Sequence, residues 1–292
     1  MNNLFGTDPE FFVTNSSGVC IPPALLRYNR DLETFGFSDP EDVPEEEKRH
    51  PIFYKDDELL IIEDGAAFEF TVTPSKEPHE LYYKVARGKE ILKELVKPLG
   101  LRIYDKPAVT FDPQVLFING VLNQYLSWSC RFGCDRDLDI YSGAYSEDVD
   151  ASTITQRFGG GHFHISPIDH GRFPLVTRLF DIFLGSTFIS ATQYPEEEKA
   201  RQKFYGRPGK IRLQTYPSGT TGIEYRPPSN SWLSNFDTVK LMFKAAQSAL
   251  EVAENEDKSV ELIDGYLDRV INNMLTFNQQ DSKLVLAELN IL

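Results

Sequence analysis

The sequence predicts an α+β fold, with strands toward the beginning of the chain and helices toward its end. A tight hairpin signal joins two strand-like segments at 58–63 and 66–73. From residue 236 onward the apolar residues recur with the helical period. The chain shows no internal repeat and no low-complexity linker, so we expect residues 1–292 to form a single domain.

The N-terminal part begins with a strand at 4–13, which ends at a turn rich in Asn, Ser and Gly. The acidic stretch 27–57 is expected to be a solvated surface loop. Residues 77–97 have helical periodicity and stop before a proline, and 101–104 is a short strand.

The rest of the chain alternates irregular stretches with hairpins and helices. Residues 105–160 lack long periodic segments, whereas 174–191 form an apolar helix that we expect in the core. A second hairpin is expected at 211–215 and 221–226. Three more helices are expected at 236–254, 259–275 and 281–289.

The composition indicates an acidic protein with ample material for a core. Hydrophobic residues make up 41% of the 292 residues, and the net charge is -14. That charge argues against nucleic acid as a partner, because phosphate contacts need a basic footprint. No basic leader precedes an apolar run and no stretch approaches a membrane span, so we expect no membrane partner. The three cysteines, Cys20, Cys130 and Cys134, are too few for a disulfide framework, which favours the reducing cytoplasm.

Two carboxylates stand two residues apart in the first predicted strand, within the stretch FGTDPEFFV. Side chains at i and i+2 project from the same face of a strand, so Asp8 and Glu10 are expected side by side. Burying two unpaired acids is costly, and a hard divalent cation with oxygen ligands would compensate. The stretch therefore predicts a cation above this strand.

A third carboxylate lies on the strand at 66–73. Phe68 and Phe70 point to one of its faces, and Glu69 points to the other between small residues. This arrangement indicates either a ligand that faces a cavity or an acid on the wet face of an antiparallel sheet.

Two of the five histidines follow three glycines in the stretch GGGHFHIS. His162 and His164 share a strand face, and the glycines permit close approach of a ligand or of another strand. A zinc site completed by Cys130 and Cys134 is the alternative. It would leave the acids elsewhere unexplained.

Six basic residues fall within fourteen positions of this otherwise acidic chain. They are Lys199, Arg201, Lys203, Arg207, Lys210 and Arg212. Such a cluster suits a polyphosphate, to which arginine offers paired hydrogen bonds. It is not a Walker A loop, because Ile211 occupies the position that needs Ser or Thr. The alternative is a solvated basic patch that balances nearby acids.

Glu224 and Arg226 share a face of the strand at 221–226, in the stretch GIEYRPPSN. They could form a structural ion pair. They could equally divide a site between them, with the acid on a metal and the arginine on a phosphate.

These motifs resemble the phage and bacterial COOH–NH2 ligase family, amidoligases that share the catalytic fold of glutamine synthetases. FGTDPEFFV is similar to the Phe-Gly-x-Glu-Pro-Glu-Phe-Phe segment of the synthetases, GGGHFHIS to their Gly-x-Gly-x-His-x-His-x-Ser segment, and GIEYRPPSNSWL to their Ile-Glu-x-Arg-x-Pro-Asp stretch. The ligase family also shows a DGxxxE strand, a GCDPDFxxYxG-like segment and a YGxxGxxR loop, which match 64–69, 133–143 and 205–212 here. The matching motifs occur in order and cover roughly residues 4–250.

The resemblance implies a curved antiparallel β-sheet, a half-barrel, with helices packed on its outer face and the site in its concavity. In such enzymes ATP phosphorylates a carboxylate, and an amine then displaces phosphate from the acyl-phosphate to form an amide or peptide bond. Divalent cations, Mg²⁺ or Mn²⁺, offset the charge of the polyphosphate and of the substrate acid. The substrates would be a small-molecule or peptide carboxylate and amine.

The family's site residues carry over by position. The implied metal ligands are Asp8, Glu10, Glu69, His162 and Glu224, with Asp64 as a weaker candidate. The implied nucleotide-binding residues are His164, Arg207, Lys210 and Arg212. The implied catalytic residues are Arg212 and Arg226, which would stabilise charge on the transferring phosphoryl group, together with Glu224. The short side chain of Asp8 leaves open whether it reaches a metal directly or through water.

The helical segment 258–292 falls outside the resemblance, as a C-terminal extension that could serve assembly into an oligomer. Three other functions stay open: a guanidino-type phosphotransferase on the same fold, a non-catalytic virion or scaffold protein that retains the fold, and a zinc-site hydrolase. The cytoplasm would be that of the host if the protein is phage-encoded.

Overall fold

The structure, a computed structural model, describes residues 3–24, 26, 50–116, 136–147, 149, 151, 153–216 and 219–292. The cysteines of the zinc alternative, Cys130 and Cys134, lie outside the described residues, as does most of the acidic stretch 27–57.

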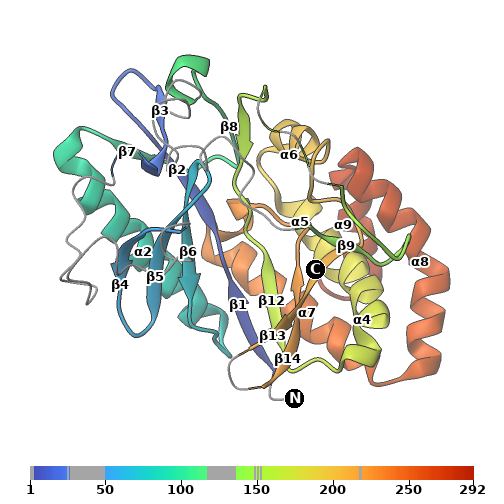
Figure 1. The fold of residues 1–292 in the computed structure, drawn as a ribbon. Helices are drawn as coiled ribbons and strands as arrows, with labels where there is room; N and C mark the ends of the chain where they lie inside the picture. The colour runs from blue at the N-terminus through green and yellow to red at the C-terminus, as the bar shows by residue number, and fades with distance from the viewer. Residues whose placement is uncertain are drawn as a thin grey trace.

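One sheet has the strand order β1-β12-β14-β13-β9-β10, and neighbouring strands in it are antiparallel (Figure 1). Its strands are Leu4–Thr7 (β1), Phe163–Ser166 (β12), Thr221–Tyr225 (β14), Lys210–Thr215 (β13), Leu138–Asp139 (β9) and Ala144–Tyr145 (β10). The hairpin of β13 and β14 confirms the one expected from the sequence.

A second antiparallel sheet has the order β3-β2-β6-β5-β4, and β7 also pairs with β2. Its strands are Cys20–Ile21 (β3), Glu10–Thr14 (β2), Ala67–Val72 (β6), Leu59–Asp64 (β5), Ile52–Lys55 (β4) and Arg102–Tyr104 (β7). Gly65 makes the β5–β6 turn with a positive φ of 56°, a conformation that other residues adopt only under strain. Two short strands, Ala108–Thr110 (β8) and Gln156–Phe158 (β11), pair separately.

The first predicted strand is in fact two strands, so the expectation that Asp8 and Glu10 share one strand face is wrong. Asp8 and Pro9 separate β1, which pairs with β12, from β2, which pairs with β6. Pro9 has no N–H to donate to a strand ladder, and the chain leaves the first sheet there. The Pro9 carbonyl accepts from Phe70 N at 2.9 Å, and Glu10 N donates to Gly160 O at 2.9 Å. These bonds join the two sheets into a curled antiparallel half-barrel (Figure 1).

Helices cover one side of this curled surface. The helix expected at 77–97 is α2 (Pro78–Val96), which packs on β5, β6 and β7. It approaches β6 closely at Gly88, where an added Cβ would lie 2.8 Å from the Phe70 ring. Among the described residues, the other helices apart from short 3₁₀ turns are α4 (Phe173–Phe180), a π-helical turn (Asp181–Gly185), α5 (Ser186–Ala191), α6 (Pro195–Arg201), α7 (Phe236–Ala253), α8 (Glu256–Thr276) and α9 (Gln279–Glu288).

The apolar side chains of the first sheet point toward these helices. Phe163 of β12 contacts Phe243 of α7, with ring centroids 5.9 Å apart, and Tyr225 of β14 contacts Phe180 of α4 at 5.8 Å. Successive side chains of a strand alternate between its faces. The polar side chains that alternate with them on β12, β13 and β14 therefore point to the opposite face of the sheet.

The last two helices belong to the main core. Val270 and Met274 of α8 and Val285 and Leu286 of α9 are buried in the same apolar cluster as the sheet residues. The segment that the sequence set apart as an extension thus packs against the rest of the chain.

One apolar helical segment, His170–Ala191, is long enough to cross a membrane and has a mean hydropathy of 1.3, although the sequence suggested no such stretch. Of its most apolar window, 78% is buried inside the fold. It includes the helix that we expected in the core, interrupted by the π-helical turn.

Candidate functional site

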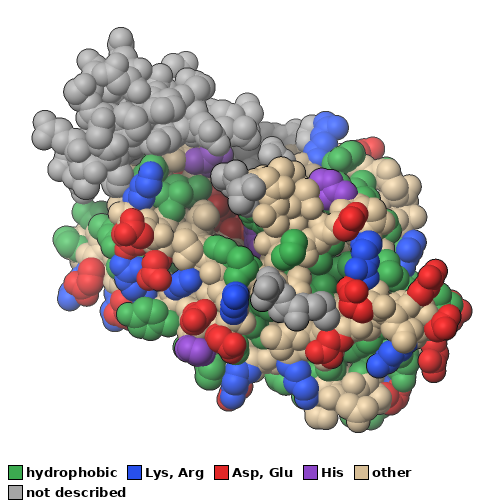
Figure 2. All heavy atoms as spheres, turned by 90° about the horizontal axis from the view of Figure 1, so that it is seen from below, with side chains coloured by type: hydrophobic (Ala, Val, Ile, Leu, Met, Phe, Trp, Pro, Cys, Tyr) green, Lys and Arg blue, Asp and Glu red, His purple; other side chains and the backbone are tan. Residues whose placement is uncertain are grey.

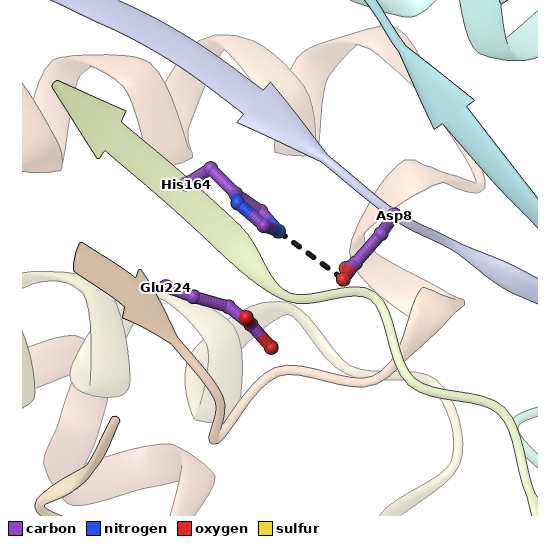
Figure 3. A group of neighbouring side chains, drawn as sticks. All are labelled: Asp8, His164 and Glu224. Atoms are coloured by element: carbon purple, nitrogen blue, oxygen red, sulfur yellow. Dashed lines mark ion pairs between the residues drawn. The ribbon is translucent and has the colours of Figure 1, made fainter. Parts of the chain in front are cut away.

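Three of the predicted residues form a group that we call the histidine cluster: Asp8, His164 and Glu224 (Figure 3). One donor atom from each lies within 4.8 Å of the others. His164 and Glu224 are direct neighbours across β12 and β14, and Asp8 follows β1, so its Oδ2 lies 3.2 Å from His164 Nε2. Three strands that are far apart in the sequence thus bring these side chains to one face.

His162 lies beside this cluster. Its Nδ1 is 3.1 Å from Asp8 Oδ1 and 3.2 Å from Glu224 Oε1. Its other ring nitrogen, Nε2, is buried and has no hydrogen-bond partner among the described residues. A Cβ placed on Gly160 would lie 2.8 Å from that Nε2 and 3.2 Å from Glu10 Oε1, so the nitrogen faces the region next to Glu10. A buried imidazole nitrogen without a hydrogen-bond partner is typical of a histidine that binds a metal ion.

A second group, the acid cluster, consists of Glu10, Asp64 and Glu69. Glu10 and Glu69 are paired across β2 and β6, and one oxygen of each of the three carboxylates lies within 4.8 Å of the others. Gly160 N donates to Glu10 Oε2 at 2.9 Å. His50 Nδ1 lies 3.6 Å from Asp64 Oδ1.

The electrostatics of the acid cluster favour a cation. Burial, followed by the charge of Asp64, raises the pKa of Glu10 to about 7. Burial and then the charges of Asp64, Asp8 and Glu10 raise the pKa of Glu69 well above its ordinary value. These carboxylates resist being ionised together, and a hard divalent cation with oxygen ligands would relieve that repulsion. The donor set therefore fits Mg²⁺ or Mn²⁺.

The histidine cluster is already compensated in charge. Burial by itself raises the pKa of Glu224, but Arg226 and His162 outweigh it and hold this pKa well below its ordinary value. Burial likewise acts to raise the pKa of Asp8, and the two imidazoles lower it by more. Asp8 and Glu224 are therefore held ionised as ligands require.

Two arginines bind the Glu224 carboxylate. Arg212 Nη1 lies 3.2 Å from Glu224 Oε2, and Arg226 Nη1 contacts Glu224 Oε1. Arg226 also pairs with Asp137 through Nε, and its side chain is 2% exposed, against 29% for Arg212. Gln214 Nε2 donates to Glu224 Oε2 at 2.5 Å. The predicted pairing of Glu224 with Arg226 is present, and Arg212 is the more accessible guanidinium.

The other predicted basic residues lie at the edge of this group. Lys210 Nζ is 3.3 Å from Asp139 Oδ2 and 3.0 Å from Ser146 Oγ, and Arg207 is exposed in the loop before β13. Arg201, which the sequence grouped with them, is buried and donates to the backbone carbonyls of residues 226–228. The basic run is therefore not one phosphate-facing surface.

Sequence reasoning missed several residues of the site. Gln214 and Tyr216 follow Arg212 at spacings of two, so strand alternation could have placed them on its face. Tyr216 Oη lies 3.5 Å from His164 Nδ1. Asp137 falls within a segment that carries the family resemblance, but nothing local shows that it pairs with Arg226. The sequence likewise carries no signal that places His50 beside Asp64.

Acidic and histidine side chains are visible in a hollow on one face of the molecule, with basic and apolar side chains around it (Figure 2).

No family model and no curated protein matches this chain. Among solved structures, it is similar to a novel glutamine synthase homologue, with 12% identity over 99% of this chain and 68% of that one and a TM-score of 0.45. It is also similar to GmaS without ligand, with 12% identity over 99% and 69% and a TM-score of 0.43. A GmaS/ADP complex matches with 10% identity over 99% and 70% and a TM-score of 0.38.

Proposed function

We propose that this protein is an ATP-dependent carboxylate–amine ligase that uses Mg²⁺ or Mn²⁺. The observation that carries the proposal is the adjacency of the acid cluster and the histidine cluster, with the unpartnered His162 Nε2 facing Glu10. Adjacent cations suit the transfer of a phosphoryl group, in which several negatively charged oxygens must meet.

Each cluster would hold a cation with its own donors. Glu10, Asp64 and Glu69 offer oxygen ligands, with His162 Nε2 next to Glu10, and Asp8, His164 and Glu224 offer a mixed oxygen and nitrogen set. When bound, the cations would offset the charge of the polyphosphate and of the substrate acid.

The arginines would divide the remaining electrostatic work. Arg212 is accessible enough to bind a phosphoryl oxygen, whereas Arg226 is enclosed between Glu224 and Asp137. We therefore assign phosphoryl stabilisation to Arg212 and the orientation of Glu224 to Arg226. His164, Lys210 and Arg207 would assist binding of the nucleotide.

The proposed reaction has two displacements. A carboxylate oxygen of the acid substrate attacks the γ-phosphorus of ATP, and ADP leaves. The amine nitrogen then attacks the acyl carbon, phosphate leaves, and the nitrogen loses a proton to give the amide. The substrates would be a small-molecule or peptide acid and amine in the cytoplasm.

The test is mass spectrometry after incubation with ATP, Mg²⁺ and a pool of amino acids and peptides. We expect ADP together with a product lighter by one water than its two parents, and no product with the Glu10→Gln or Glu224→Gln variants. A product heavier by one phosphoryl group would support the phosphotransferase alternative instead. Release of AMP would contradict the acyl-phosphate route.

A further inference from the structure

Helix α6 carries two buried charged side chains that belong to neither cluster. Glu198 and Arg201 are each 1% exposed. Glu198 Oε1 accepts hydrogen bonds from the hydroxyls of Ser229 and, at 3.0 Å, Ser231. A buried carboxylate is stable only where it accepts hydrogen bonds, and these two bonds hold the 229–231 segment against α6.

Arg201 fixes the preceding residues of the same segment. Its guanidinium donates to the carbonyls of Arg226 at 3.1 Å, Pro227 at 2.5 Å and Pro228 at 3.2 Å. Two successive prolines have no N–H, so their carbonyls are the only backbone groups by which hydrogen bonds can hold them. One planar guanidinium occupies all three carbonyls, which a lysine ammonium cannot match in geometry.

This segment contacts the glycine run that holds Glu10. Asn230 N donates to Gly159 O at 3.2 Å, and Asn230 Nδ2 donates to Glu10 O at 2.6 Å. Gly160 pairs with Ser229 in a β-bridge, and its N–H is the donor to Glu10 Oε2. The backbone of Glu10 is thus held by Asn230 and its carboxylate by Gly160, and both belong to or contact the segment that α6 binds.

The backbone of the glycine run 159–161 lies so close to the 226–231 segment and to Glu10 that no side chain fits between them. A Cβ on Gly161 would lie 2.6 Å from Ser229 O, and one on Gly159 would lie 2.8 Å from both Glu10 O and Asn230 Nδ2. A displacement of the 226–231 segment therefore has to displace Glu10 as well.

We propose that Glu198 and Arg201 are positioning residues for the acid cluster. They hold the 226–231 segment, the segment holds the glycine run 159–161, and the run aims the Glu10 carboxylate at Asp64 and Glu69. This inference rests on the proposed function, because it concerns the cation that the acid cluster would bind.

Mn²⁺ binding to the full-length protein without nucleotide tests this inference, with free Mn²⁺ measured by electron paramagnetic resonance. We expect Arg201→Lys and Glu198→Met to weaken Mn²⁺ binding by about 10-fold to 100-fold, the range seen when groups that orient metal ligands are removed. The matched control is Arg269→Lys, which alters an arginine of α8 that is bonded to Asp281 and Glu288 of α9. We expect Arg269→Lys to leave Mn²⁺ affinity unchanged, even if it lowers thermal stability as much as the α6 variants do.

Two results separate the inference from the proposed function. If Glu10→Gln binds fewer Mn²⁺ ions than the parent while both α6 variants bind as the parent does, the positioning role is wrong and the metal site of the acid cluster stands. If Glu10→Gln binds Mn²⁺ as the parent does, the metal site itself is wrong. Should Arg201→Lys fail to fold, Glu198→Met carries the same test, because it removes the acceptor oxygens and nearly keeps the size of the side chain.

Discussion

The neutral variant Glu10→Gln should make the metal-free protein more stable while weakening its response to cations. Glu10 is 6% exposed, and burial together with Asp64 raises its pKa from 4.5 to about 7. A carboxyl whose pKa is raised by folding stabilises the folded state most at low pH, where it is protonated. That contribution is lost as the pH rises from about 4.5 through about 7.

The magnitude follows from the shift. A difference of roughly 2.5 pKa units at 1.36 kcal/mol per unit makes the ionised Glu10 cost about 3 kcal/mol at pH 8. Glutamine can still accept from Gly160 N and carries no charge. We therefore expect Glu10→Gln to raise the free energy of unfolding in EDTA by about 2–3 kcal/mol at pH 8, and to change it little at pH 5.

Urea denaturation at both pH values, with EDTA and then with excess Mn²⁺, measures the two effects. Mn²⁺ should stabilise Glu10→Gln less than the parent, since ligands add stability only to the state that binds them and the variant lacks one ligand of the acid cluster. Glu90→Gln, at an exposed position of α2 that pairs with Lys93, is the matched control and should behave as the parent. A Glu10→Gln protein that is less stable than the parent in EDTA at pH 8 would refute the electrostatic argument. Equal stabilisation of both proteins by Mn²⁺ would refute the metal assignment.

Three further predictions follow from the described geometry. Asp137→Asn should lower the free energy of unfolding by about 1.5–3 kcal/mol, because it removes one of the two carboxylates paired with the buried Arg226, and a loss below 1 kcal/mol in urea melts would contradict this. Gly161→Ala should lower the free energy of unfolding by about 1–3 kcal/mol, since the new methyl group would lie 2.6 Å from a carbonyl oxygen. Gly265→Ala on α8, which has open space around it, should instead raise this free energy by up to ~1 kcal/mol. Thermal melts that rank the two variants the other way would contradict the packing argument. Mn²⁺ affinity should rise with pH through about 7, where Glu10 loses its proton, and calorimetric titrations that give a flat profile would contradict the raised pKa.

Local signals were sufficient for most of the elements. The β5–β6 hairpin turns at Asp64-Gly65, and the long helices carry the apolar period that the sequence shows. The break at Pro9 could not be predicted in the same way. Residues on both sides of it have strand character, and only the different partners of β1 and β2 separate them.

The sequence also pointed to most of the site residues, but it did not show that they divide into two clusters. Spacing suggested that Asp8 and Glu10 act as one pair, whereas the bend places Asp8 with the histidines and Glu10 with Asp64 and Glu69. Arg201 was grouped with phosphate-binding residues on charge alone, and its burial against three carbonyls depends on tertiary contacts. The roles of Asp8, Glu10, Glu69, His162 and Glu224 as metal ligands stay predictions.

The bend at Asp8 and Pro9 also has a consequence for the order of folding. The carboxylate of Glu10 is bonded to Gly160, 150 positions away, and its carbonyl to Asn230, 220 positions away. Contacts so distant in sequence form slowly, because a long loop must close before they are gained. Both clusters should therefore be completed only at the end of folding, so a refolding chain should acquire Mn²⁺ in its final kinetic phase, after the local hairpins and helices have formed.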